Sequence, residues 1–371
     1  MKELKFMTEF QYLQRVMDAK ESFERAHPGV TIVIEQSTDH FDSKSAYESD
    51  EAPDIIESGG WSLFNNKDMF VDLNPYVAEV DGLEEDLYHG PMRVARHNGL
   101  LPGLPVDVSI PLIVYNKELF DRAGLAYPTE DLTWDEFIEV GKKLTIRNEL
   151  GVASQFGFGI GVDIEWYEPF VFRNGGSYLS PNGSTARGYI DSPATIEAFR
   201  KVIDAYRMHG VIRKPDEPSE AGQLHEGFAM IFGFMWFTGD LIYHKIDDKF
   251  GVVGLPKMKI GDQSNMIYMG AAGVTSKSKN PRLAWEFLHH YIIERHSWPL
   301  PITHSQTKER GLTEHRLWSR YMEELDHVRP SGFYLSEKWN SSRQLINEDI
   351  HRMILEGVDV SKTLRSWTRF A

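Results

Sequence analysis

The sequence predicts an α/β protein with two domains. A chain of 371 residues exceeds the length at which a single hydrophobic core usually stops growing, so two cores are expected. A strand, a helix and a second strand follow one another at the N-terminus, which is the order found in a parallel α/β sheet. No linker-like tract, internal repeat or low-complexity segment divides the chain. We therefore expect the chain to cross between its two domains more than once.

The first elements are defined by the spacing of their apolar residues. LKFMT at 4–8 predicts a short strand, and apolar side chains then recur at helical spacing over 9–29, until Pro28 and Gly29 end the pattern. VTIVIEQ at 30–36 alternates in the manner of a half-buried strand. APDIIES at 52–58 predicts a further strand that ends at the turn GGW.

Later helices carry start signals. TWDE at 133–136 is a capping box, in which the Thr133 side chain caps the helix and Glu136 reaches back to it. Ser192 before Pro193 predicts another helix, and Asn280 before Pro281 repeats the pattern. Between the helices we expect extended segments at 112–116, 156–160, 227–232, 250–256 and 269–276.

Composition and charge exclude several classes of protein. The net charge of −15 argues against a general nucleic-acid binder, because the chain would repel phosphate. The absence of cysteine excludes disulfides, cysteine-ligated zinc, iron–sulfur clusters and thiol catalysis. No apolar run reaches the ~18 residues needed to span a membrane, and the sequence shows no signal peptide.

No motif predicts catalysis, a metal or a cofactor. GFGIGV at 157–162 is similar to a dinucleotide-binding loop, but Val162 stands where the third glycine is required. Carboxylates such as Asp163 and Glu165 can be paired as acid and base in any chain with 55 Asp and Glu residues, so the pairing assigns nothing. We therefore expect no catalytic residues, no metal site and no cofactor.

Aromatic residues in turns are the remaining functional pattern. Trp61 follows the turn SGG, Trp166 and Tyr167 follow a glycine-rich strand, and Trp236 lies in the apolar stretch GFAMIFGFMWFTGDL at 227–241. A flat ring can stack on the apolar face of a pyranose while neighbouring polar groups bond the sugar hydroxyls. The pattern is typical of a carbohydrate-binding site, whereas tryptophans within the predicted helices are expected in the core, namely Trp134 and Trp285.

The ordered set of segments over residues 4–365 resembles the extracellular solute-binding proteins of ABC importers, family 1, the family of the maltose-binding protein. The segments that carry the resemblance are FERAHPGVTI, APDIIESGGW, GLPVDVSIPLIVYNKELFDRAGLAYPTEDLTWDEFIEVGKKLT, EGFAMIFGFMWF, GAAGVTSKSKNPRLAWEFLHHY and LINEDIHRMILEGVDVSKTL. The final LRSWTRFA has no counterpart in the family pattern.

The resemblance implies a periplasmic-binding-protein-like fold. In that fold two α/β lobes are joined by hinge strands, and the ligand cleft lies between them. By match to the family pattern, the crossings fall near 107–111, 269–273 and 301–305. Lobe one is then expected at 1–108 plus 270–303, and lobe two at 109–269 plus 304–371.

The resemblance also implies ligand contacts. Trp236 matches the family position at which a tryptophan lies against the sugar, and Trp61 matches a ligand-facing loop of the first lobe. Asp39 and His40 follow the second strand, where family members place a polar contact, and Asp107 stands beside the first crossing. The full set of expected ligand-binding residues is Asp39, His40, Gly60, Trp61, Asp107, Trp166, Tyr167, Trp236, Tyr268, Gly270 and Trp339.

The implied function is extracytoplasmic binding of a carbohydrate for delivery to an ABC transporter. Several spaced aromatic residues suit several sugar rings, so an oligosaccharide is expected. The implied partners are the membrane permease subunits, the protein is expected to be a non-catalytic monomer, and its place is the cell surface, as a lipoprotein, or the periplasm. Three alternatives stay open. The first is a binding protein of the same fold for another solute, such as a polyamine, an organophosphate or a metal complex. The second is a glycoside hydrolase or lyase, and the third is a sensor or adhesin.

Overall fold

The protein consists of two compact units. The structure is a computed structural model that describes residues 2–8, 14–37, 43–96, 99–259, 263–295 and 300–371. One unit comprises Met1–Ser109 and Ile267–His315, and the other comprises Ile110–Met266 and Arg316–Ala371. The main difference from the predicted lobes concerns 304–315, which the prediction assigned to lobe two. These residues pack in the first unit, where the Tyr88 ring lies 4.0 Å from that of His304 and its hydroxyl bonds Thr307 at 3.0 Å.

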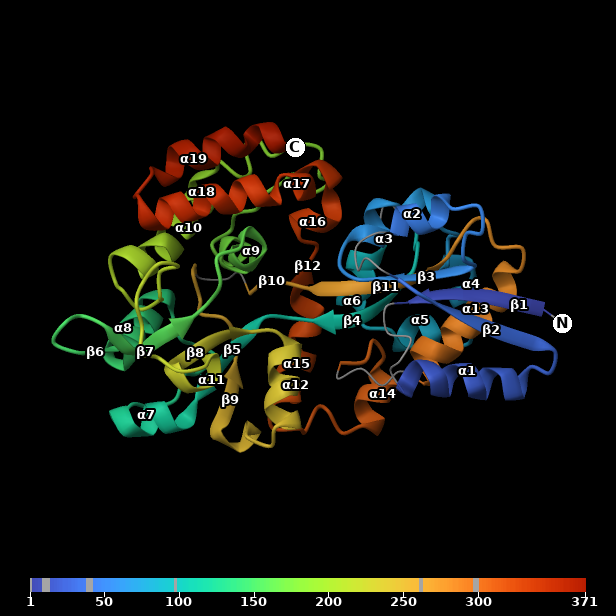
Figure 1. Ribbon diagram of the computed structural model, residues 1–371, viewed down its shortest axis with the longest axis horizontal. Coiled ribbons are helices and arrows are strands. Elements are labelled where there is room, and N and C mark those ends of the chain that lie inside the picture. The colour runs from blue at the N-terminus through green and yellow to red at the C-terminus, as the bar shows by residue number, and fades with distance from the viewer. Residues whose placement is uncertain (1, 9–13, 38–42, 97–98, 260–262, 296–299) are drawn as a thin grey trace. The chain divides into compact units, whose positions relative to one another are not determined.

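A five-stranded mixed sheet forms the centre of the first unit (Figure 1). Its strands, in the order β2-β1-β3-β11-β4, are β2 (Val30–Gln36), β1 (Lys2–Thr8), β3 (Ile55–Ser58), β11 (Tyr268–Val274) and β4 (Leu104–Ser109). β1 is parallel to β2 and β3, as the strand–helix–strand order predicts. β11 is antiparallel to both β3 and β4, because it belongs to the segment that re-enters the unit after residue 266. The parallel arrangement predicted from the N-terminal segments therefore holds for β1, β2 and β3, and β11 adds an antiparallel strand.

Helices of the first unit bury aromatic side chains against this sheet. On α1, Phe23 meets the ring of Phe287 edge-on at 5.2 Å, and Phe287 also contacts Phe6 of β1. Trp285 is buried, as predicted for a helical tryptophan. The helices are α1 (Gln14–Ala26), α2 (Ser43–Glu48), α3 (Ser62–Asn65), α4 (Asn74–Ala78), α5 (Leu83–Asp86), α6 (His89–Ala95), α13 (Pro281–His289), which continues as a π-helix over His290–Glu294, and α14 (His304–Glu309).

The second unit contains a five-stranded sheet of its own. In the order β6-β7-β8-β5-β9, the strands are β6 (Ile146–Arg147), β7 (Ala153–Gly159), β8 (Phe228–Gly233), β5 (Leu112–Asn116) and β9 (Phe250–Val253). β7 and β8 are parallel, whereas β5 is antiparallel to β8 and β9. Four of these strands confirm the extended segments predicted from the sequence. A separate two-stranded ladder joins β10 (Asn265–Met266) to β12 (Val328–Arg329).

Several helices of the second unit begin where the sequence predicts. Thr133 and Glu136 form the expected capping box of α8, and the Ser192 side chain accepts from the Thr195 amide at the start of α10. In the first unit, by contrast, Asn280 precedes α13 without a capping bond from its side chain. The helices of the second unit are α7 (Lys117–Ala123), α8 (Trp134–Leu144), α9 (Ile164–Arg173), α10 (Pro193–Arg207), α11 (Leu224–Gly227), α12 (Met235–Tyr243), α15 (Trp318–Glu324), α16 (Gly332–Leu335), α17 (Glu337–Ser341), α18 (Arg343–Leu355) and α19 (Val360–Ser366).

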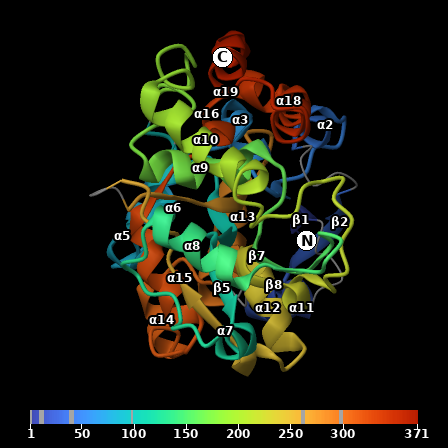
Figure 2. The same cartoon turned by 90° about the vertical axis from the view of Figure 1, so that its left-hand side faces the viewer.

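A helical layer covers one side of this second sheet. Helices α9 and α10 pack on each other, and α18 and α19 pack on α10, farther from β7 and β8 in both views (Figures 1 and 2). The unmatched C-terminal segment belongs to this layer, because Trp367 is buried and its ring lies 5.7 Å from that of Phe199 on α10. Within the described ranges, no helix combines the length and apolar character needed to cross a bilayer.

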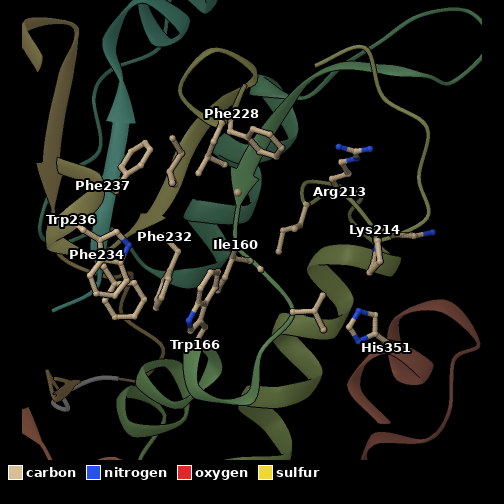
Figure 3. A pocket seen from close by; sticks show the side chains of 17 residues that line it. Ile160, Trp166, Arg213, Lys214, Phe228, Phe232, Phe234, Trp236, Phe237 and His351 are labelled. Atoms are coloured by element: carbon tan, nitrogen blue, oxygen red, sulfur yellow. The ribbon is translucent and has the colours of Figure 1, made fainter. Parts of the chain in front are cut away.

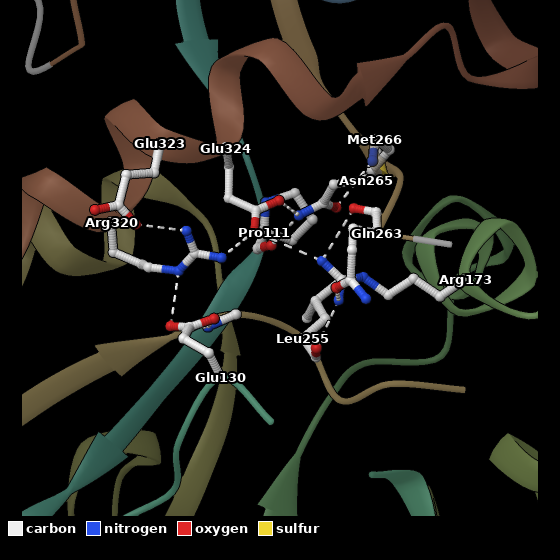
Figure 4. A network of polar contacts seen from close by, with 11 residues as sticks. Pro111, Glu130, Arg173, Leu255, Gln263, Asn265, Met266, Arg320, Glu323 and Glu324 are labelled. Carbon is white, nitrogen blue, oxygen red and sulfur yellow. Dashed lines mark hydrogen bonds and ion pairs between the residues drawn. The ribbon is translucent and has the colours of Figure 1, made fainter. Parts of the chain in front are cut away.

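A buried polar network connects the segments at which the chain enters and leaves the second unit (Figure 4). Glu324, at the end of α15, forms ion pairs with Arg320 and with Arg173 of α9, the latter at 3.6 Å. The Asn265 amide donates to Glu324 at 3.2 Å and to the Pro111 carbonyl at 2.9 Å. Because Pro111, Asn265 and Arg320 each lie close to a boundary between the units, the network fixes all three boundary segments to this unit.

Candidate functional site

A cavity of about 630 Å³ lies in the second unit, beside the ends of β7 and β8 (Figure 3). Its lining comes from the end of β7 and the loop after it, Trp166 of α9, the segment 212–215, α11 with β8 and α12, and His351 of α18. Most of the lining side chains are aromatic or aliphatic. The volume is within the range of pockets that bind small molecules, so the cavity is the candidate ligand site.

One wall of the cavity is built from stacked aromatic rings. Phe234 caps α12, and its ring lies 4.4 Å from that of Trp236 at an interplanar angle of 14°. The ring of Trp166, on α9, lies 6.0 Å from those of Phe232 and Phe234. Phe232 and Phe234 are buried, whereas Trp236 retains 46% of its accessible surface. A rigid base of buried rings therefore supports an indole that is available to a ligand.

The glycine-rich strand end owes its composition to close packing. A Cβ atom at Gly161 would lie 2.4 Å from the ring of Trp166, and one at Gly157 would lie 2.1 Å from the carbonyl oxygen of Gly141 in α8. Side chains at these positions would displace the indole or the helix. The sequence GFGIGV thus lets a helix and an aromatic ring approach the strand, which gives its glycines a physical role that needs no dinucleotide.

The side of the cavity away from Trp236 carries cationic side chains (Figure 3). Arg213 and Lys214 follow a short β-bridge at Ile212, and the Arg213 Nε donates to the main-chain oxygen of Glu217 at 3.1 Å. The Glu217 carboxylate accepts from the Lys214 amide at 3.1 Å and forms an ion pair with Arg147 at 2.5 Å. The cavity therefore combines an aromatic wall with hydrogen-bond donors on the opposite side.

His351 adds a further polar group at the cavity. Its Nδ1 lies 2.8 Å from the Asn347 carbonyl oxygen, which can only accept, so Nδ1 carries a proton. In the neutral ring the other nitrogen, Nε2, is then a hydrogen-bond acceptor that can meet a ligand hydroxyl. Among the described residues that line the cavity, none has a carboxylate or an amide side chain.

Two buried carboxyl groups flank Trp166 on α9 without lining the cavity. Burial raises the pKa of Glu165 to about 7, although the Arg343 guanidinium at 3.1 Å opposes the shift. Burial also raises the pKa of Glu168 to about 8, against a hydrogen bond of 2.9 Å from the Gly332 amide. These groups belong to the contact between α9, which carries Trp166, and the C-terminal helices.

The structure separates the predicted ligand contacts of the second unit into two groups. Trp166 and Trp236 both line the cavity. Tyr167 is fully buried and its hydroxyl donates to that of Tyr206 at 3.1 Å, while Trp339 is fully buried with its ring 5.5 Å from that of Tyr178. Because helical periodicity turns Tyr167 away from the face that carries Trp166, its side chain enters the core. This placement favours a core role for Tyr167 and Trp339, and we leave both out of the proposed site.

The predicted contacts of the first unit gather at one end of its sheet. Gly60 and Trp61 follow β3, Tyr268 begins the neighbouring strand β11, and Asp107 lies on β4. A Cβ atom at Gly270 would lie 2.6 Å from the Ser58 carbonyl oxygen, so this glycine permits β11 to approach β3. Asp39 and His40 lie outside the described residues.

Asp107 has an unusual backbone. Its φ of 48° lies in the left-handed region, which few residues other than glycine adopt. The pairing of β4 with β11 shifts at this point, so that Asp107 and Val108 together stand opposite Met269. Such a bulge re-aims a side chain, and bulges are frequent beside binding sites.

Sequence reasoning missed the cationic side of the cavity. Arg213 and Lys214 stand in VIRKPDEP, between a helix and the next strand, with no pattern that distinguishes them from other surface cations. His351 lies about 140 residues further along the chain, and only the packing of α18 brings it to the cavity.

Comparison with known proteins identifies a family. A family model described as bacterial extracellular solute-binding protein matches residues 7–292. A probable amino-acid ABC transporter periplasmic-binding protein, y4oP of Sinorhizobium fredii, is 30% identical over 217 residues, which are 51% of this chain and 47% of that protein. The sn-glycerol-3-phosphate-binding periplasmic protein UgpB of Agrobacterium fabrum is 27% identical over 46% of this chain and 35% of its own length. The matches thus span less than half the length of these relatives.

Solved structures match over almost the whole chain. The ABC substrate-binding protein Lmo0181 from Listeria monocytogenes, in complex with cycloalternan, has a TM-score of 0.80 at 19% identity, covering 99% of this chain and 97% of that one. The sugar-binding protein MalE from Xanthomonas citri has a TM-score of 0.83 at 16% identity, covering 99% and 96%. At these identities the similarity establishes the fold, which confirms the predicted periplasmic-binding-protein-like class.

Proposed function

Because this chain belongs to the bacterial extracellular solute-binding protein family, we propose that it binds a carbohydrate for an ABC importer. The proposed ligand is an oligosaccharide, and the proposed partners are the membrane permease subunits that receive it. The protein would act outside the cytoplasm as a monomer, either free in a periplasm or held at the cell surface by a lipid. It would carry out no chemistry on its ligand.

The aromatic wall is the observation that carries this proposal. Trp236 presents a half-exposed indole backed by Phe234 at 4.4 Å, and Trp166 lines the same cavity. Sugars expose flat patches of C–H groups that pack on the faces of aromatic rings. The sugar hydroxyls then form hydrogen bonds with polar groups beside those rings. Arg213 and Lys214 supply donors on the other side of the cavity, and the free ring nitrogen of His351 supplies an acceptor.

The first unit contributes a second set of proposed contacts. We propose that Trp61 and Tyr268 meet the ligand and that the bulge at Asp107 directs a carboxylate to its hydroxyls. Gly60, with its left-handed backbone, and Gly270 would bring the main chain close to the ligand. These residues come from the ends of adjacent strands, which is where ligands meet α/β sheets.

The chemistry of the cavity favours a sugar over an amino acid. The relative y4oP is a probable amino-acid transporter component, and an amino acid carries an ammonium group. A buried ammonium needs an acceptor such as a carboxylate. Within the described lining, the charged side chains are cations, which would repel it.

A calorimetric titration with a panel of mono-, di- and trisaccharides tests the proposal. We expect at least one oligosaccharide to bind, with Trp166→Ala weakening it, and mass spectrometry to find the sugar intact after long incubation. Trp134→Phe, which alters a tryptophan buried in α8 of the same unit, serves as the control and should leave the affinity unchanged. Binding of an amino acid but of no saccharide, or cleavage of the sugar, would refute the proposed function.

A further inference from the structure

We propose that the saccharide bound in this cavity is anionic, with a carboxylate or phosphate held by Lys214 and Arg213 while its pyranose rings stack on Trp166 and Trp236. This inference rests on the proposed function and narrows it to a substrate class. Its basis is the sign of the charge at the cavity, which is opposite to that of the whole chain. The chain carries a net charge of −15, yet the charged side chains in the described lining are cationic.

The carboxylate that bonds this segment is itself engaged. Glu217 accepts from the Lys214 amide and forms an ion pair with Arg147. The Lys214 ammonium has no hydrogen-bond or ion-pair partner within the described ranges, although its side chain is partly buried. A partly desolvated cation without a counter-charge attracts an anion more strongly than a fully exposed one does.

Neutral sugars would form weaker hydrogen bonds with Arg213 and Lys214 than anionic sugars would. A hydroxyl accepts from an ammonium or guanidinium, but a charge-assisted bond to a carboxylate or phosphate is about twice as strong. Arginine also pairs with either anion through two parallel bonds, and the exposed Arg213 has its Nη atoms available for such a pair. The donor set thus matches an anionic group better than it matches a hydroxyl.

The separation of the two walls sets the shape of the ligand. Figure 3 places Trp236 and Phe234 on the opposite side of the cavity from Arg213 and Lys214, so a ligand that reaches both sides presents an apolar face at one end and an anion at the other. A uronic-acid disaccharide and a sugar phosphate share that chemistry. A free inorganic anion lacks the apolar face and would bind weakly.

Titration calorimetry on matched ligand pairs tests the inference. The acidic probes are digalacturonate, cellobiouronate and glucose 6-phosphate, and their neutral counterparts are galactobiose, cellobiose and glucose. We expect one acidic probe to bind at least about tenfold more tightly than its counterpart, which corresponds to 1.4 kcal/mol. The carboxylate and phosphate arms identify which anion is preferred, and the affinity should fall as salt is raised.

Variants connect that preference to the cations. Lys214→Gln should lower the affinity for the acidic probe roughly tenfold, as expected on losing one charge-assisted bond, and should leave that for the neutral probe within about twofold. Lys214→Arg should restore the preference. Arg122→Gln, on the exposed face of α7 and outside the cavity, removes the same charge as a control and should change neither affinity.

The outcomes separate the inference from the function on which it rests. If neutral saccharides bind as tightly as acidic ones and Lys214→Gln binds both as the unaltered protein does, the anionic class is refuted and the carbohydrate function stands. If no saccharide of either charge binds, both proposals fail. Binding of inorganic phosphate alone, with no contribution from a sugar, would also overturn the inference.

Discussion

Truncation of Trp236 distinguishes a ligand-stacking residue from a core residue. Its indole is 46% exposed and stacks on Phe234 at a centroid distance of 4.4 Å. An aromatic pair of this kind contributes about 0.5–1.5 kcal/mol beyond the area that it buries, so Trp236→Ala should lower the free energy of unfolding by only about 1–2 kcal/mol. Trp339→Ala is the matched comparison, because that ring is fully buried and its loss should cost about 3–5 kcal/mol.

Binding should show the reverse order of effects. A stacking contact is worth on the order of 1–3 kcal/mol by analogy with bases stacked on aromatic side chains, so Trp236→Ala should weaken saccharide binding roughly 5- to 150-fold. Trp339→Ala, where it folds, should bind within about threefold of the unaltered protein. Denaturant unfolding and calorimetric titration of the two variants provide both quantities. A large loss of stability with unchanged affinity in Trp236→Ala would refute the proposed role of this residue.

Three further perturbations probe the support of the site. Burial raises the pKa of Glu168 from 4.5 to about 8, so the folded state keeps a proton that the unfolded state loses. The free energy of unfolding should therefore fall as pH rises from about 4.5 to about 8. Glu168→Gln, compared by denaturant unfolding across this range, should remove up to about 1 kcal/mol per pH unit of that slope. Glu324→Gln leaves a buried guanidinium without its carboxylate and should lower the free energy of unfolding by about 3–5 kcal/mol. Glu323→Gln, in which the altered side chain is 66% exposed, should lower it by less than about 1 kcal/mol. Equal losses in denaturant unfolding would contradict the role given to the network. Gly161→Ala should weaken saccharide binding in a calorimetric titration, because the Trp166 ring, 2.4 Å from the new methyl group, must shift. Gly239→Ala, with open space around it, should leave the affinity unchanged. Unchanged binding in Gly161→Ala would show that the position of the Trp166 ring does not matter.

The fold could be predicted from the sequence because its signals are local. Helix starts such as the Thr133 capping box depend on residues within one turn, and the alternation of 30–36 needs only neighbouring side chains. The direction of β11 could not be read in the same way, since it depends on where the chain re-enters the first unit after residue 266. Local patterns define elements, whereas long-range connections define their pairing.

The candidate site shows the same limit. The sequence predicts Trp236 as a ligand contact in a turn, whereas the structure places it in the helix α12, where it lines the cavity. Trp166 and Tyr167 are adjacent in the sequence, and only the orientation of α9 decides that one lines the cavity and the other enters the core. Lys214 and His351 come from distant segments, so their convergence required the packing of α18.

The crystal structure of the protein with its tightest-binding saccharide tests the central claim most directly. We predict a pyranose ring lying on the indole of Trp236 or Trp166 in the cavity of the second unit, with an anionic substituent within hydrogen-bond distance of Lys214 or Arg213. A saccharide bound elsewhere, with both indoles uncovered and the cavity filled by solvent, would contradict the account.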